Sequence, residues 1–127
     1  CLGMQLLFDT GEENGFQQGL GLIPGHVTAL APGGYLKVPH VGWNNLATIA
    51  PHPLLAGIKQ HVDFYFVHSF HCVPEEKSAV LATCDYGGEF AAVVAKANVA
   101  GTQFHPEKSQ PSGLRLLTNF ADWSPKC

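Results

Sequence analysis

The sequence predicts a single mixed α/β domain that is rich in strands and carries a helix at each end. Three observations support this fold class. The 127 residues are enough for one domain with one core. Apolar residues make up 46% of the chain and charged residues only 13%, so a well-buried core is expected. Strand-like segments fill the middle of the chain, and helix-like segments lie near both ends.

The first half of the chain is expected to contain one short helix and two strands. Residues 2–8 (LGMQLLF) favour a helix, and the glycine-rich residues 12–21 favour a loop. Strands are predicted at 26–30 (HVTAL) and 35–41 (YLKVPHV), separated by the turn sequence APGG. Residues 42–58 are expected to be mostly loop, because their two prolines exclude a long helix.

The second half is expected to supply most of the sheet. Residues 63–72 (DFYFVHSFHC) are the strongest strand candidate, because they are aromatic and β-branched. Residues 78–86 and 89–99 predict a hairpin that turns at a Tyr-Gly-Gly sequence. A further short strand is predicted at 99–105.

The last segment, 111–123 (PSGLRLLTNFADW), predicts a helix. Ser109 or Ser112 is expected to cap its start. An apolar stripe at helical spacing is expected to pack on the core, and consists of Leu114, Leu117, Phe120 and Trp123.

Composition argues against several classes of protein. The formal net charge is −3 and no run of lysine or arginine occurs, which argues against an electrostatic nucleic-acid partner. The longest apolar runs are far shorter than a membrane span. The first residues lack the basic leader of a secretory signal and soon become acidic.

The cysteines and histidines indicate free thiols rather than a metal site. The widely spaced cysteines form no CxxC pair, and are Cys1, Cys72, Cys84 and Cys127. We expect free thiols in a reducing compartment, and therefore a cytoplasmic protein. No HExxH motif occurs, and His68 and His71 should face opposite ways on a predicted strand. The sequence thus predicts neither a metal nor another cofactor.

Cys1 is a candidate nucleophile. A thiol attacks as the thiolate, and a helix N-terminus lowers the pKa of a thiol there. Cys1 stands directly before the predicted helix, and Gly3 would let a substrate come close to backbone N–H groups. The alternative, which position alone favours, is a structural cysteine or an accident of where the chain starts.

His105 and Glu107 form a second candidate group, in the segment GTQFHPEKS. Pro106 pushes His105 into an extended conformation, in which residues two apart project to one side. The carboxylate of Glu107 can then orient the imidazole and stabilise its protonated form. A cysteine nucleophile needs such a base. By itself, the tripeptide HPE is also typical of a surface turn.

Five segments together resemble the class I, triad-type glutamine amidotransferases. In order they are CLGMQLLF, GLGLIPG, VPHVGWNNL, YFVHSFH and GTQFHPEKS. The resemblance extends from residue 1 to about residue 120. PHVGWN and YFVHS are similar to one branch in particular, the glutaminase subunit of imidazole glycerol phosphate synthase in histidine biosynthesis. The resemblance implies a flavodoxin-like α/β fold, with residues 1–127 as the C-terminal portion of a glutamine amidotransferase domain.

The resemblance also implies roles for individual residues. Cys1 would be the nucleophile at a strand–helix turn, His105 the general base and then acid, and Glu107 its orienter. Gln5 and the backbone of Ser69 and Phe70 would hold the glutamine substrate.

Family members pass the ammonia that they release to a synthase partner. The partner here would be the cyclase subunit of imidazole glycerol phosphate synthase, in a heterodimer. The resemblance places Tyr65 and one loop on the partner's side, and the loop consists of Pro39, His40, Val41, Gly42, Trp43 and Asn44.

The sequence departs from the family pattern at its beginning. Family members have a strand before the cysteine, and a glycine-rich strand that supplies part of the oxyanion hole. The chain is therefore expected to be a piece of a longer glutaminase, and its fold is expected to be incomplete on the N-terminal side. Phe70 and His71 also differ from the more usual residues after YFVHS.

Three alternatives remain at this point. In one, the α-amino group of Cys1 serves as the base, without His105 or Glu107. In another, the chain is a non-catalytic fragment that survives as a packing module. In the third, it is a glutaminase that serves another synthase, in an aromatic, purine or pyrimidine pathway.

Overall fold

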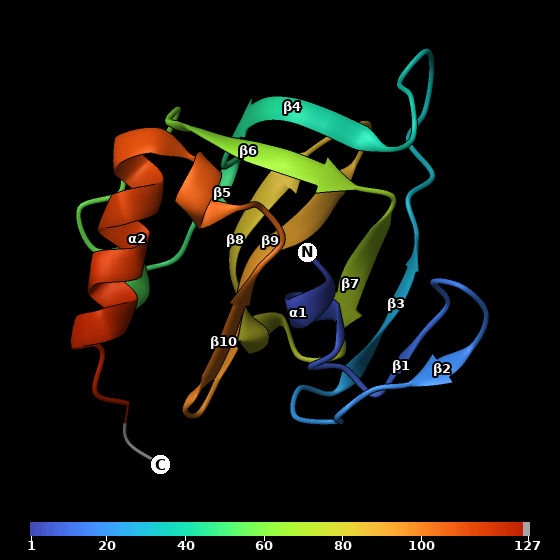
Figure 1. The fold of residues 1–127 in the computed structure, drawn as a ribbon, viewed down its shortest axis with the longest axis horizontal. Helices are drawn as coiled ribbons and strands as arrows, with labels where there is room; N and C mark the ends of the chain where they lie inside the picture. The colour runs from blue at the N-terminus through green and yellow to red at the C-terminus, as the bar shows by residue number, and fades with distance from the viewer. Residues whose placement is uncertain (126–127) are drawn as a thin grey trace.

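The computed structural model describes residues 1–125 and has mixed α/β architecture, which confirms the predicted fold class (Figure 1). The elements follow in this order: α1 (Leu2–Gln5), β1 (Thr10–Gly11), β2 (Gln17–Gln18), β3 (Gly25–Ala29), β4 (His40–Asn45), β5 (Thr48–Ile49), the 3-10 helix η1 (Pro53–Leu55), β6 (Asp63–His68), β7 (Phe70–Pro74), η2 (Lys77–Ala79), β8 (Val80–Asp85), β9 (Glu89–Lys96), β10 (Val99–Thr102), η3 (Pro106–Lys108) and α2 (Gln110–Asp122).

The strands of the described residues form three sheets. Two sheets have four strands each, in the orders β2-β1-β3-β7 and β10-β9-β8-β5, and the third pairs β4 with β6. Only the pair β1–β3 is parallel among these strands. Figure 1 shows β4 and β6 crossing one end of the β8–β9 hairpin, with α2 beside them.

The hairpin predicted around the Tyr-Gly-Gly turn is confirmed. Strands β8 and β9 pair in antiparallel fashion on either side of it. Gly87 and Gly88 have φ angles of 69° and 145°, a region that glycine enters without the clash of a Cβ atom. The buried hydrophobic residues form two core clusters, and the six inner residues of β9 are all buried. Phe90 and Val93 pack in one cluster, and Ala91 and Val94 pack in the other.

The predicted strand at 63–72 is divided in two at Ser69. β6 pairs with β4, whereas β7 pairs with β3, so the chain changes sheets at this residue. The change places Phe64 and Phe66 in one core cluster and Cys72 in the other. Local sequence favours one long strand, but burial of both halves requires the bend at Ser69.

Several boundaries in the first half differ from the prediction. Helix α1 ends at Gln5, and the expected loop at 12–21 contains strand β2. The strand predicted at 35–41 begins only at His40 and continues into the expected loop at 42–58, which also holds β5 and η1. The reason is the partner strand: β6 pairs with the whole of β4, and such long-range hydrogen bonds leave no local signal.

Helix α2 is confirmed, but of its predicted core-facing stripe only Trp123 packs against the core, whereas the prediction is wrong for the other three residues. Leu114 is 63% exposed and Phe120 is 55% exposed, whereas Gly113 and Leu116 are buried. A Cβ atom at Gly113 would lie 1.9 Å from the carbonyl oxygen of Pro106. The helix therefore packs closely through its glycine face, which turns the apolar stripe partly outward.

The cysteines that the structure describes are free thiols: Cys1, Cys72 and Cys84. Burial raises the pKa of Cys72 and of Cys84 to about 12, which keeps both thiols protonated at neutral pH. Cys127 lies outside the described residues. Within residues 1–125, no helix has the length and apolar character needed to cross a membrane.

Candidate active site

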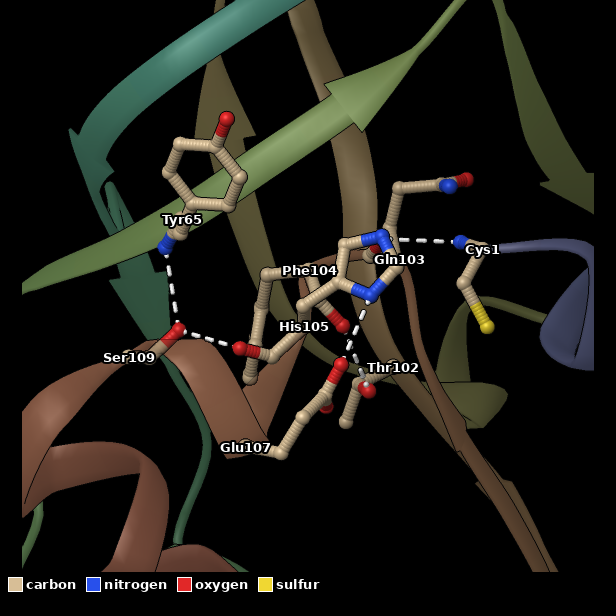
Figure 2. A network of polar contacts seen from close by, with 8 residues as sticks. All are labelled: Cys1, Tyr65, Thr102, Gln103, Phe104, His105, Glu107 and Ser109. Carbon is tan, nitrogen blue, oxygen red and sulfur yellow. Dashed lines mark hydrogen bonds and ion pairs between the residues drawn. The ribbon is translucent and has the colours of Figure 1, made fainter.

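The candidate site forms where the chain leaves β10. The N–H of His105 donates to the carbonyl of Tyr65 on β6 (2.9 Å), and the carbonyl of Gln103 accepts from the α-amino group of Cys1 (2.8 Å). Figure 2 shows the contact between Cys1 and Gln103 beside the ring of His105. The first residue of the chain and residues more than a hundred positions later therefore lie side by side.

His105 and Glu107 lie together, as their spacing predicts. The Nδ1 atom of His105 is 2.9 Å from a carboxylate oxygen of Glu107. Burial acts to raise the pKa of Glu107, but hydrogen bonds from its own backbone and from His105, with the charge of His105, lower it overall. The carboxylate thus holds the Nδ1–H tautomer, and Figure 2 shows the other ring nitrogen turned away from Glu107, on the side of Cys1.

Ser109 fixes this segment from behind, a role that the sequence did not reveal. Its hydroxyl donates to the carbonyl of His105 (2.6 Å) and accepts from the N–H of Tyr65 (3.0 Å). Ser109 stands at the N-cap of α2, as predicted, but makes no side-chain cap bond there. Because Ser109 is 1% exposed, both bonds are shielded from water.

Cys1 stands at the N-cap of α1, as its position in the sequence predicts. Burial lowers the pKa of its α-amino group to about 6, against the opposing effect of Cys72, Glu13 and Glu107. Figure 2 shows the amino group directed toward Gln103 and the sulfur atom pointing away from the imidazole of His105. Attack by the sulfur on a substrate that bridges the two groups therefore needs rotation of the Cys1 side chain.

A cavity of about 470 Å³ joins the predicted residues. Its wall includes four of them, namely Cys1, Gln5, Ser69 and His105. Glu107 and Phe70 are not part of the wall, and Glu107 is connected to it only through its bond to His105. Residues within 1–27, the segment 67–69 and His105 thus line a single hollow of the size of a small-molecule site.

The cavity also contains polar residues that sequence reasoning missed. Glu13 and Asn14 come from the β1–β2 loop, Gln17 and Gln18 from β2, and His68 from the end of β6. The sequence predicts only a loop at 12–21, although the adjacent acidic residues Glu12 and Glu13 are a possible signal.

The residues expected on the partner's side divide between the surface and the interior. Val41 is 56% exposed and Trp43 is 49% exposed, and the Trp43 ring lies 5.6 Å from that of Tyr65. Pro39 is exposed, and Asn44 donates to the carbonyl of Asp85 (3.1 Å). His40 differs from the expectation, because only 3% of it is exposed and its ring lies in the interior.

Gln103, whose carbonyl accepts from Cys1, is a further buried polar residue beside the site. It is 0% exposed, and within residues 1–125 neither atom of its side-chain amide has a hydrogen-bond partner.

The sequence as a whole is similar to proteins of one family. The family model "Glutamine amidotransferase class-I" matches residues 1–123. Three relatives are each 51% identical to this chain, and come from Desulfitobacterium hafniense (strain DSM 10664 / DCB-2), Syntrophotalea carbinolica and Rhodospirillum rubrum. All three are named imidazole glycerol phosphate synthase subunit HisH.

These matches cover 97%, 96% and 98% of this chain, but 57%, 62% and 59% of the respective relatives. The chain therefore spans about three fifths of the length of the curated relatives it matches. The segment that the family model matches, residues 1–123, spans Cys1, the HPE sequence and the strands between them. On the evidence of the family match and of the site that these residues build, the chain belongs to the class I glutamine amidotransferases.

Proposed function

We propose that this chain carries the machinery for hydrolysis of glutamine to glutamate and ammonia. The observation that carries the proposal is the shared cavity of Cys1, Gln5, Ser69 and His105, with Glu107 bonded to the imidazole. A nucleophile, a base and an orienting carboxylate are the parts that amide hydrolysis through a thioester needs. Family membership supports the same chemistry.

The steps follow from these groups. His105 takes the proton of the Cys1 thiol, and the thiolate attacks the side-chain amide carbon of glutamine. The protonated imidazole then gives its proton to the departing ammonia, which leaves a thioester on Cys1. Water, deprotonated by His105, attacks the thioester and releases glutamate, and the thiol is restored. Glu107 stabilises the imidazolium that forms in each half of the cycle.

The cavity wall also supports recognition of an amino acid. We assign Gln5 and the Ser69 backbone to the substrate, as the sequence predicts, and add Glu13 as a partner for its α-ammonium group. Glu13 lines the same cavity as Cys1, and its charge already acts on the α-amino group of Cys1. A carboxylate at this place favours a bound cation.

We further propose that the ammonia passes to the cyclase subunit of imidazole glycerol phosphate synthase, in the cytoplasm, for histidine biosynthesis. The names of the relatives support this partner rather than another synthase. Exposed Val41 and Trp43, beside Tyr65, offer an apolar surface for it. A protein route matters because ammonia that reaches bulk water at neutral pH becomes ammonium, which is a poor nucleophile.

Labelling of thiols tests whether the site is assembled. The protein encoded by the complete gene is treated with a chloroketone analogue of glutamine, and the modified peptides are mapped by mass spectrometry. We expect modification of Cys1, slowed by added glutamine, while Cys72 and Cys84 stay unmodified because they are buried protonated thiols. Equal modification of the cysteines, or none, would support the non-catalytic alternative.

Glutamate release tests the reaction itself. Cys1→Ser should lower turnover by at least about 10³-fold, because a hydroxyl is a much weaker nucleophile than a thiolate. Cys84→Ala, a change at a thiol outside the cavity, is the matched control and should retain turnover. With the cyclase subunit present, glutamine should support imidazole glycerol phosphate formation; failure there, with turnover intact, would reject this partner alone.

A further inference from the structure

A pair of buried histidines joins two strands behind the candidate site. His40 begins β4 and His68 ends β6, and the two residues lie directly opposite each other in the antiparallel pair. The Nδ1 atom of His40 is 3.0 Å from the Nε2 atom of His68, and the Nδ1 atom of His68 is 2.8 Å from the carbonyl oxygen of Phe70. The two histidines are 3% and 6% exposed.

These contacts allow a single arrangement of protons in the neutral pair. The carbonyl of Phe70 can only accept, so the Nδ1 atom of His68 must carry its hydrogen. The Nε2 atom of a neutral His68 is then an acceptor, and the Nδ1–H of His40 must donate to it. Burial lowers the pKa of both histidines, that of His68 to about 4, so both are neutral at neutral pH.

Aromatic rings hold His40 in this orientation. Its ring stacks on Tyr86 at 3.9 Å and on Phe66 at 5.0 Å, with interplanar angles of 21° and 20°. Phe90 lies 4.8 Å from the ring of His68. A change in either imidazole would therefore disturb several packed rings, which makes the hydrogen-bonded arrangement rigid.

The pair spans the bend at Ser69. β6 ends at His68 and β7 begins at Phe70. The bond from the His68 ring to the Phe70 carbonyl therefore connects the two residues that flank Ser69. His68 and Ser69 both line the cavity that contains Cys1. At the other end of the pair, the next residue along β4 is the exposed Val41.

We propose that the His40–His68 pair is a positioning device that fixes the Ser69 bend in the cavity wall and ties it to strand β4. Its effect on catalysis rests on the proposed glutaminase function. Neither histidine touches the reacting atoms in this scheme. Loss of the donor on His40 leaves the Nε2 atom of His68 buried without a partner, which favours rotation of the His68 ring and release of the Phe70 carbonyl. The backbone of Ser69 then no longer matches the substrate.

Two substitutions at His40 separate the hydrogen bond from packing. In His40→Asn, the amide nitrogen takes the place of Nδ1 and keeps the donor, but the side chain is too small to fill the space between the rings. In His40→Leu, the volume is better filled and the donor is lost. The protein encoded by the complete gene is used for both, with glutamine turnover and thermal unfolding as measurements.

We expect His40→Leu to raise KM for glutamine about tenfold or more with a smaller effect on kcat, and His40→Asn to stay within about threefold of the native KM. Thermal stability should show the opposite order, with the leucine variant at least as stable as the asparagine variant. A purely structural role predicts that the leucine variant is better in both measurements, and that result would overturn the proposal.

A second measurement does not depend on turnover. Nitrogen-15 NMR of the imidazole rings reports the tautomers directly, and both histidines should be in the Nδ1–H form, whereas free histidine prefers Nε2–H. Nε2–H tautomers in either residue would reject the pair even in an active enzyme. Nδ1–H tautomers in a protein without glutaminase activity would leave the pair intact and reject only the proposed function.

Discussion

His105 is held at three points, by one distant strand and by two neighbouring residues in the chain. Its N–H bonds to Tyr65 on β6, its carbonyl accepts from Ser109 at the start of α2, and its ring bonds to Glu107 on η3. A base that must receive and return a proton within one cycle benefits from such constraint, because its geometry is set before the substrate binds.

A change at His105 tests whether its imidazole is the base of the site. We expect His105→Ala to lower kcat for glutamine by about 10³-fold or more, because the thiol loses its general base and the leaving ammonia its acid. The exposed His26 gives the control His26→Ala, which should retain native turnover. Near-native turnover in His105→Ala would reject His105 as the base of the site.

Among the elements, α2 and η3 depend on each other. Gly113 lets the helix approach so closely that a Cβ atom there would lie 1.9 Å from the Pro106 oxygen and 2.9 Å from the Cβ atom of Ser109. Both neighbours belong to the segment that presents His105 and Glu107. Helix α2 thus acts on the site through its packing on this segment, although its own predicted apolar stripe is largely exposed.

Gly113→Ala should destabilise the protein by about 1–3 kcal/mol, because the methyl group forces α2 away from η3. Urea unfolding measures the change in free energy. Alanine otherwise favours a helix over glycine, so a stabilised variant would contradict this packing. Ser112→Ala, one residue earlier on the same helix, is the control and should change stability little. Turnover should fall with Gly113→Ala as the Glu107 carboxylate shifts.

At the scale of the whole molecule, the buried histidines couple stability to pH. Burial, with smaller effects of His40, the α-amino group and His71, lowers the pKa of His68 to about 4, against the bond to Phe70. An unfolded histidine titrates near 6.5. Between these values the unfolded chain binds a proton that the folded chain does not, so stability falls as pH falls through this window.

We expect the free energy of unfolding to decrease by up to about 3 kcal/mol between pH 6.5 and pH 4 from His68 alone. Urea unfolding at several pH values measures it. His68→Asn keeps a donor toward the Phe70 carbonyl but does not titrate, so its stability should decline less steeply over the same range. Equal slopes for the two proteins would show that His68 is not buried in its neutral form.

The two catalytic segments were the part of the site best predicted from sequence. The HPE sequence is predictable because its geometry depends only on neighbouring residues: Pro106 and a spacing of two place the carboxylate of Glu107 beside the imidazole of His105. Cys1 at the start of a helix is equally local. Glu13, His68 and Ser109 were missed because their roles arise from contacts with residues far away in the chain.

By itself, the sequence determined the elements whose signals lie within a few neighbouring residues: the hairpin at Gly87 and Gly88, the position of α2, and the His105–Glu107 pair. Only the tertiary structure decided where the strand at 63–72 bends, which face of α2 is buried, and that His40 meets His68. These outcomes depend on which distant strands pair and on how closely backbones approach. Such pairing energies belong to two segments at once, and neither segment carries them alone.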